Sequence, residues 1–207
     1  MNFKTEQESF WAGEFGNKYI NRNQGANLLA SNISFFSKAL GRAGNIKAAI
    51  EFGANIGMNL QALKLLYPAA DFHAIEINPT AVSQLQSLIP SSNIYQDSIL
   101  NWTPPLLWDL VLIKGVLIHI NPEHLPQVYE KLVASTSKYL LVAEYYNPTP
   151  VTISYRGHND RLFKRDFAGE LMGLHSEMKL IDYGFAYHND TKFPQDDITF
   201  FLMEKIG

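Results

Sequence analysis

Residues 49–57 read Ala-Ile-Glu-Phe-Gly-Ala-Asn-Ile-Gly, a short apolar run followed by two glycines four residues apart. Gly53 can adopt the backbone angles of a sharp turn from strand to helix, and Gly57 lets the helix pack close to the strand. The free N–H groups of the helix N-terminus then face the turn. Such a stretch is typical of the nucleotide-binding turn of an α/β protein.

The turn lacks one glycine of the dinucleotide-binding pattern G-x-G-x-x-G. The middle glycine of that pattern lets a pyrophosphate approach the backbone, and Asn55 stands in its place. A cofactor that contains adenosine but no pyrophosphate therefore fits better. Glu76 ends the next apolar run and follows Gly57 at about the twenty-residue spacing of a ribose-binding carboxylate. A carboxylate there would repel a 2′-phosphate, which disfavours an NADP-type ligand. Glycines at a turn and an acid that caps a helix also occur without any ligand.

Composition narrows the class of protein. The chain has 207 residues and 46% hydrophobic content, which suits one domain. A net charge of −3 gives no overall attraction to nucleic acid or to an anionic membrane. The absence of cysteine excludes disulfides, thiolate metal sites and cysteine nucleophiles. We expect a cytoplasmic protein with a small-molecule partner and no metal, and the sequence leaves its oligomeric state open.

Strands and helices alternate from residue 47 onward, and the strands are continuous apolar runs, which favours a parallel sheet covered on both faces. The expected strands are Lys47–Phe52, Asp71–Ile77, Asn93–Tyr95, Trp108–Lys114 and Tyr139–Glu144, and the expected helices are Gly57–Leu66, Pro79–Leu88 and Asn121–Ser135. Leu180–Tyr187 and Ile198–Lys205 have no helix between them, so they should pair antiparallel.

The predicted fold is therefore α/β: a Rossmann-like, doubly wound sheet of seven strands, mostly parallel with a reversed last strand, plus an N-terminal helical cap. Within a single domain of residues 1–207 we expect four parts. They are the cap at 1–45, a cofactor-binding core at 46–145, a substrate-loop insertion at 146–170, and a helix end with a hairpin at 171–207.

From Glu51 onward the chain resembles the class I S-adenosylmethionine-dependent methyltransferases. The resemblance lies in the glycine turn, the acid after strand two, Asp97 after strand three, and residues 109–120 at strand four. In that superfamily these elements lie beneath the amino-acid part of the cofactor, at the ribose and beside the adenine, and N-terminal helices often cover the cofactor. The resemblance implies S-adenosyl-L-methionine as cofactor, with contacts at Glu51, Gly53, Ala54, Asn55, Gly57, Glu76, Ile77, Asp97, Ser98, Lys114 and Gly115, and cover residues Tyr19 and Arg22.

A closer resemblance covers nearly the whole chain. Residues 5–16, 114–122, 144–150, 155–158 and 162–170 are similar to bacterial methylases associated with pseudaminic acid biosynthesis. That similarity implies nonulosonic acid or surface-glycan chemistry, and it names no acceptor.

Two side chains near the ends of strands four and five are candidates for catalysis. Methyl transfer from a sulfonium depends mainly on positioning and desolvation, and a hydroxyl acceptor also benefits from a general base. His119 can act as that base, or it can merely pack or cap the next helix. Glu144 can orient the acceptor, or it can simply close its strand as a solvated carboxylate.

The segment Tyr145–Asp166 is rich in aromatic and basic side chains where the sheet needs only a connection, which favours a functional loop. Arginine suits carboxylates and phosphates, so an anionic small substrate is expected; the alternative is a solvated basic loop. The connection at residues 188–197 should return to the edge of the sheet where the cofactor binds, and it contributes the acidic residue Asp196. The predicted substrate-binding residues are Tyr145, Tyr146, Tyr155, Arg156, His158, Lys164, Arg165 and Asp196.

The sequence thus predicts methyl transfer to oxygen or nitrogen of a small anionic metabolite, such as a sugar acid, a nonulosonic acid or an amino-acid-like compound. Two other functions stay open. One is an NAD-dependent oxidoreductase, which would use the same turn and acid. The other is a catalytically silent cofactor-binding partner of a glycan-biosynthetic enzyme.

Overall fold

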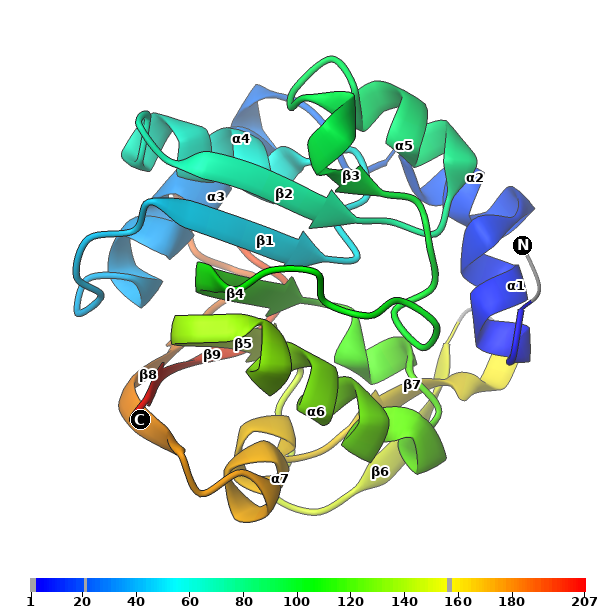
Figure 1. The fold of residues 1–207 in the computed structure, drawn as a ribbon. Coiled ribbons are helices and arrows are strands. Elements are labelled where there is room, and N and C mark those ends of the chain that lie inside the picture. Colours follow the sequence, from blue (N-terminus) through cyan, green and yellow to red (C-terminus); the bar gives the residue numbers. More distant parts are fainter. Residues whose placement is uncertain (1–2, 21, 156–157) are drawn as a thin grey trace.

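The computed structural model of the protein describes residues 3–20, 22–155 and 158–207. A mixed β-sheet forms its centre, with helices on both faces (Figure 1). In this described part the sheet has seven strands in the order β3-β2-β1-β4-β5-β9-β8. The strands are β1 Ala48–Phe52, β2 Asp71–Ile75, β3 Ile94–Tyr95, β4 Trp108–Lys114, β5 Thr136–Glu144, β8 Met178–Ala186 and β9 Ile198–Lys205.

Strand directions confirm the predicted topology. The pairs β1–β2, β1–β4, β2–β3 and β4–β5 are parallel. The last strand, β9, lies antiparallel to β5 and to β8. The carboxyl ends of the parallel strands therefore meet at one edge of the sheet, and the connection from β8 to β9 returns to that same edge.

Among the described residues, the two larger clusters of buried hydrophobic side chains lie on opposite faces of the sheet. Along β4, Val111 and Ile113 are buried on the face covered by α6 Leu125–Ser135 and α7 Phe167–Leu174. Leu110 and Leu112 are buried on the other face, against α3 Ala26–Ala39 and α4 Met58–Leu66. Burial on both faces explains the uninterrupted apolar run of this strand.

The N-terminal helices α1 Glu6–Ala12 and α2 Glu14–Ile20 lie beyond the carboxyl ends of β1 and β2 (Figure 1). Thr5 and Glu8 form a capping box that starts α1. Gly16 allows the two helices to approach closely, because a Cβ at this position would lie 1.9 Å from the backbone oxygen of Trp11. This packing places α1 and α2 over the site described below.

The segment expected as a substrate loop is ordered differently. It forms the antiparallel hairpin of β6 Val151–Tyr155 and β7 His158–Lys164, which runs directly into α7. Leu162 of this hairpin is buried in the core. A hairpin satisfies its own backbone hydrogen bonds, so a connection of this length need not be irregular.

The remaining differences concern boundaries. α5 Pro79–Leu85 is shorter than expected, β5 begins three residues earlier at Thr136, and short 3₁₀ turns form at η1 Ser91–Asn93, η2 Leu117–His119 and η3 Pro122–His124. Among the described residues, no helix is long and apolar enough to cross a bilayer.

Candidate functional site

The glycine turn after β1 keeps its backbone shape without the middle glycine. Gly53, Asn55 and Gly57 have φ angles of 75°, 49° and 79°, all in the left-handed region. Asparagine adopts this region more readily than most residues with a side chain. At Gly53 there is no room for a side chain either, because a Cβ would lie 2.6 Å from Cγ2 of Val116. Asn55 therefore adds a polar side chain to the turn while its backbone keeps the left-handed conformation that glycine would adopt.

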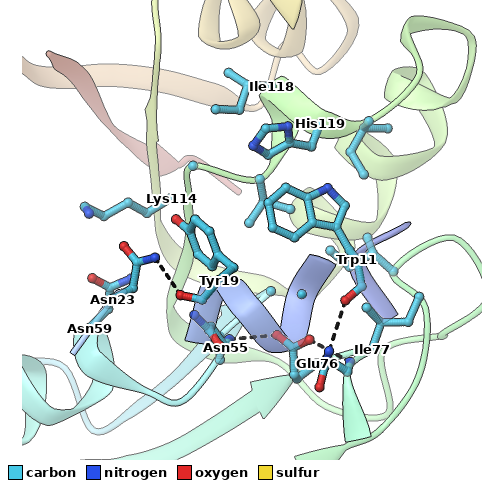
Figure 2. A pocket seen from close by; sticks show the side chains of 18 of the residues that line it. Trp11, Tyr19, Asn23, Asn55, Asn59, Glu76, Ile77, Lys114, Ile118 and His119 are labelled. Atoms are coloured by element: carbon cyan, nitrogen blue, oxygen red, sulfur yellow. Dashed lines mark hydrogen bonds between the residues drawn. The ribbon is translucent and has the colours of Figure 1, made fainter. Parts of the chain in front are cut away.

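Glu76 connects this turn to the start of α5. Its Oε2 accepts a hydrogen bond from the backbone N–H of Asn55 at 2.7 Å, and its Oε1 accepts one from the N–H of Asn78 at 2.7 Å (Figure 2). Burial raises the pKa of this carboxyl, while the backbone N–H groups of Asn78, Asn55 and Ile77 oppose the rise. A carboxylate has about four lone-pair sites, so three N–H donors leave room for another.

A cavity of about 640 Å³ opens between the turn, the end of β4, the N-terminal helices and the segment before β9. Its volume is in the range of small-molecule and cofactor sites. Most residues predicted for the cofactor line it, together with several predicted for catalysis or substrate. These lining residues are Tyr19, Arg22, Gly53, Ala54, Asn55, Glu76, Ile77, Asp97, Ser98, Lys114, Gly115, His119, Tyr145 and Asp196.

Two predicted cofactor residues lie behind the cavity wall. The Glu51 carboxyl is buried and accepts a hydrogen bond from Nδ2 of Asn59 at 2.5 Å. Burial raises the pKa of Glu51 to about 8. Gly57 packs against the end of α5 and the residues after it, where a Cβ would lie 2.8 Å from Cδ2 of Leu85 and 2.6 Å from Cδ2 of Leu88. Both residues shape the turn from below, and Asn59, which sequence reasoning missed, lines the cavity above Glu51.

Glu144 serves a different purpose from the one predicted. Its side chain is buried, and Oε1 accepts hydrogen bonds from the backbone N–H groups of Val116 and Leu117, each at 2.9 Å. Burial raises its pKa to about 7. The carboxyl does not line the cavity, and it is not the solvated strand end considered as the alternative. It holds η2, and thereby His119, in place.

The basic hairpin contributes less to the cavity than its sequence indicated. Arg165 pairs with Glu170 at 2.6 Å, Lys164 lies over the ring of Tyr145 at 5.1 Å, and Tyr146 packs near Phe201. These three predicted residues do not line the cavity. Arg156 lies outside the described residues, and for Tyr155 and His158 only the backbone positions in β6 and β7 are described.

The N-terminal helices cover the cavity with aromatic side chains. The Trp11 ring lies 4.6 Å from the ring of His119 and 5.2 Å from that of Tyr19, between ring centroids (Figure 2). The backbone oxygen of Trp11 accepts a hydrogen bond from Asn78 at 3.1 Å, and Ser98 donates its hydroxyl hydrogen to Glu8. Helix-spaced aromatic residues usually belong to a core, so their spacing does not indicate that Trp11 faces a cavity.

The connection between β8 and β9 forms the opposite wall, as its predicted return to this edge required. His188, Pro194, Gln195 and Asp196 line the cavity. Nδ1 of His188 lies 2.8 Å from the carboxylate of Asp197, whose φ angle of 52° is left-handed. Gln195 donates a hydrogen bond to Oδ1 of Asn32 at 3.0 Å. The topology located this wall in advance, whereas the pairing of His188 with Asp197 has no signature in the sequence.

Solved structures of methyltransferases share this architecture. The mitomycin 7-O-methyltransferase MmcR aligns with a TM-score of 0.66 and 13% identity over 98% of this chain, which spans 61% of that protein. The fold is that of the class I methyltransferases. The plantazolicin methyltransferase BpumL in complex with SAH aligns at 0.65 with 12% identity, covering 97% of this chain and 94% of that one.

The magnesium protoporphyrin IX methyltransferase ChlM from Synechocystis PCC 6803, with bound SAM, aligns at 0.67 with 13% identity over the full length of both chains. No protein-family model matches the sequence, and no curated protein is similar to it in sequence. At such low identity the likeness to methyltransferases concerns the fold.

Proposed function

We propose that the protein is a methyltransferase that uses S-adenosyl-L-methionine and acts on oxygen or nitrogen of a small anionic metabolite. The observation that carries this proposal is the convergence of the left-handed turn, Glu76 and Asp97 on one cavity beneath the N-terminal helices. The class I methyltransferase fold of the chain supports the same activity, because its solved examples include complexes with SAM and SAH.

The residues present fit this donor. At Gly115, whose φ angle is 67°, a Cβ would meet nothing within 4 Å, so the backbone there faces open space in the cavity. Gly53 and Ala54 would lie beneath the amino-acid part of the donor, and Glu76 would accept a hydrogen bond from a ribose hydroxyl. Asp97 and Ser98 would lie beside the adenine. When bound, the donor supplies a methyl group already activated on a sulfonium.

The protein has to hold the acceptor in line with that methyl group and keep water away. Trp11 and Tyr19 cover the cavity, and Glu144 fixes the turn that carries His119. A hydroxyl acceptor must also lose a proton, and His119 and His188 are imidazoles in the cavity wall. Asp197 holds Nδ1 of His188, which leaves Nε2 as the nitrogen to receive a proton.

An anionic acceptor is supported by the basic side chains in and near the cavity. Arg22 and Lys114 line it. Our choice of a nonulosonic or sugar acid rests on the resemblance of motifs in the sequence to pseudaminic acid-associated methylases. The predicted contacts of Arg156 and of the hairpin side chains stay proposals. The segment before β9 also bounds the cavity, and we propose that its Asp196 contacts the acceptor.

Calorimetric titration with S-adenosylhomocysteine and with NAD tests the donor assignment. We expect the protein to bind S-adenosylhomocysteine and not to bind NAD. Glu76→Ala should weaken that binding by about 1.5–3 kcal/mol if a charge-assisted hydrogen bond is lost. Glu204→Ala is the matched control and should bind S-adenosylhomocysteine like the wild type. Glu204 lies in β9 opposite Tyr139 of β5, away from the carboxyl ends of the parallel strands. Because Glu76 also holds backbone N–H groups, Glu76→Gln and a circular dichroism spectrum check that the fold persists.

Mass spectrometry then tests turnover with S-adenosylmethionine and a panel of sugar acids, nonulosonic acids and amino acids. A mass increase of one methyl group on an acid supports the proposed function. Binding of NAD in place of S-adenosylhomocysteine would identify an oxidoreductase. Donor binding without any methylated product, together with a stable protein partner, would identify a catalytically silent subunit.

A further inference from the structure

Among the described residues, the ammonium group of Lys114 lies in the cavity with no carboxylate or carbonyl oxygen bound to it. It is the last residue of β4 and lines the cavity on the side drawn with Asn23 and Asn59 (Figure 2). Within the described part of the chain, its Nζ makes no hydrogen bond and no ion pair within 4.0 Å. The Nζ atom lies over the Phe35 ring, 5.6 Å from the ring centroid. A charge held this way gains stability when a ligand brings the opposite charge.

The carboxyl groups around Lys114 do not neutralise it fully. Glu51, Asp196 and Glu144 act on Lys114 through longer-range attraction. The Glu51 carboxyl, with its pKa raised to about 8, is mostly protonated at neutral pH, and that of Glu144, raised to about 7, is partly protonated. Burial in turn lowers the pKa of Lys114 itself. Asp196 thus remains as the carboxyl that also lines the cavity.

Neutral amides line the same cavity as Lys114. The side chains of Asn23, Asn32, Asn59 and Gln195 all belong to its lining. Asn23, Asn59 and Gln195 each donate one hydrogen bond within the protein, to Tyr19, Glu51 and Asn32. Because an amide NH2 has two hydrogens, each keeps a second donor without adding negative charge, and together with one ammonium these groups suit an anion that has two oxygen atoms. The paired arginine of the hairpin, Arg165, lies outside the cavity and does not compete for such a ligand.

We propose that Lys114 is the carboxylate-binding residue of the cavity. The inference rests on the proposed function, and it assigns a specific ligand group to the side chain of Lys114, for which the sequence predicted only a cofactor contact. Two ligands carry a carboxylate that could reach it: the amino-acid end of the donor, and an acidic acceptor. The chemistry is the same in both, and separate titrations distinguish them.

The first titration compares S-adenosylhomocysteine with its decarboxylated analogue, 5′-deoxy-5′-(3-aminopropylthio)adenosine. If the donor carboxylate binds Lys114, wild-type protein should prefer S-adenosylhomocysteine at least tenfold. Lys114→Met should remove that preference, and Lys114→Arg should retain it. Lys179→Met is the matched control, because Lys179 is an exposed strand lysine at the opposite edge of the sheet.

The second arm measures methyl transfer to hydroxy and amino acids, each paired with its amide. If the acceptor carboxylate binds Lys114, Lys114→Met should raise KM for the acid at least tenfold, with kcat less affected and S-adenosylhomocysteine affinity unchanged. Lys114→Arg should restore most of the preference for the acid. A Lys114→Met protein that matches wild type in both arms overturns the proposal. Failure of wild-type protein to bind S-adenosylhomocysteine would instead contradict the proposed function.

Discussion

Glu51→Gln should make the protein less sensitive to alkaline pH. The Glu51 carboxyl is 1% exposed, and its pKa is raised from 4.5 to about 8 by burial. Below pH 4.5 it is protonated in the folded and the unfolded state. Between these pKa values the unfolded state loses the proton and the folded state keeps it, so the free energy of unfolding falls as pH rises. Above about pH 8 this loss of stability is complete.

The size of the effect follows from the part of this interval that an experiment can cover. At about 1.4 kcal/mol per pKa unit, the interval from pH 6 to about 8 corresponds to roughly 3 kcal/mol. Glutamine does not titrate, and its carbonyl oxygen can still accept the hydrogen bond from Asn59. The stability of Glu51→Gln relative to wild type should therefore rise by about this amount between pH 6 and pH 9.

Urea denaturation at pH 6, 7, 8 and 9, followed by circular dichroism, measures the difference. Glu130→Gln is the control, because Glu130 is exposed on α6 and its replacement should leave the pH profile unchanged. Glu144, with its pKa raised to about 7, contributes the same sign in both proteins and cancels in the comparison. A stability difference that stays constant from pH 6 to pH 9 would refute the placement of Glu51 as a buried, protonated acid.

Substitutions at three further positions test the site. Glu144→Ala should lower the free energy of unfolding by about 2–4 kcal/mol because two backbone N–H groups lose their acceptor, and Glu144→Gln should lose less; equal losses in urea titrations would contradict this role. Trp11→Ala should weaken S-adenosylhomocysteine binding about tenfold, or ~1.4 kcal/mol by calorimetry, whereas Leu65→Ala on the exposed face of α4 should not. Asn55→Gly should preserve donor binding, whereas Asn55→Val should destabilise the turn by about 1–2 kcal/mol, since valine tolerates a φ of 49° poorly. Similar thermal stability of the two Asn55 variants would argue against a left-handed turn.

Much of the fold follows from the sequence because the pattern of apolar residues indicates the strands, and the length of each connection indicates whether a helix lies between them. The apolar run of β4 and the missing helix before β9 predicted a parallel sheet with a reversed last strand, and the pairing confirms both. The hairpin was not anticipated. Its charged and aromatic residues resemble those of a binding loop, and only Leu162 reveals burial, which depends on contacts far away in the sequence.

The site was predictable to the extent that strand ends determine it. Spacing placed Glu76 and Asp97 at the correct edge, and both line the cavity. Spacing cannot show whether a carboxylate faces the cavity or binds backbone N–H groups. The hydrogen bonds that Glu144 accepts from Val116 and Leu117 were therefore missed. Trp11 was missed for a related reason: it reaches the cavity through the packing of a distant segment against the sheet edge.

The way α1 and α2 are attached has a consequence for measured affinities. The parallel strands are joined by continuous backbone hydrogen bonds. The helices α1 and α2 cover the cavity, and their hydrogen bonds to the rest of the protein include those that Glu8 accepts from Ser98 and that Trp11 accepts from Asn78. Only molecules whose cover is docked present the complete cavity. The apparent dissociation constant therefore equals the intrinsic one divided by the docked fraction, and a variant docked one time in ten would bind about tenfold more weakly with every ligand contact intact.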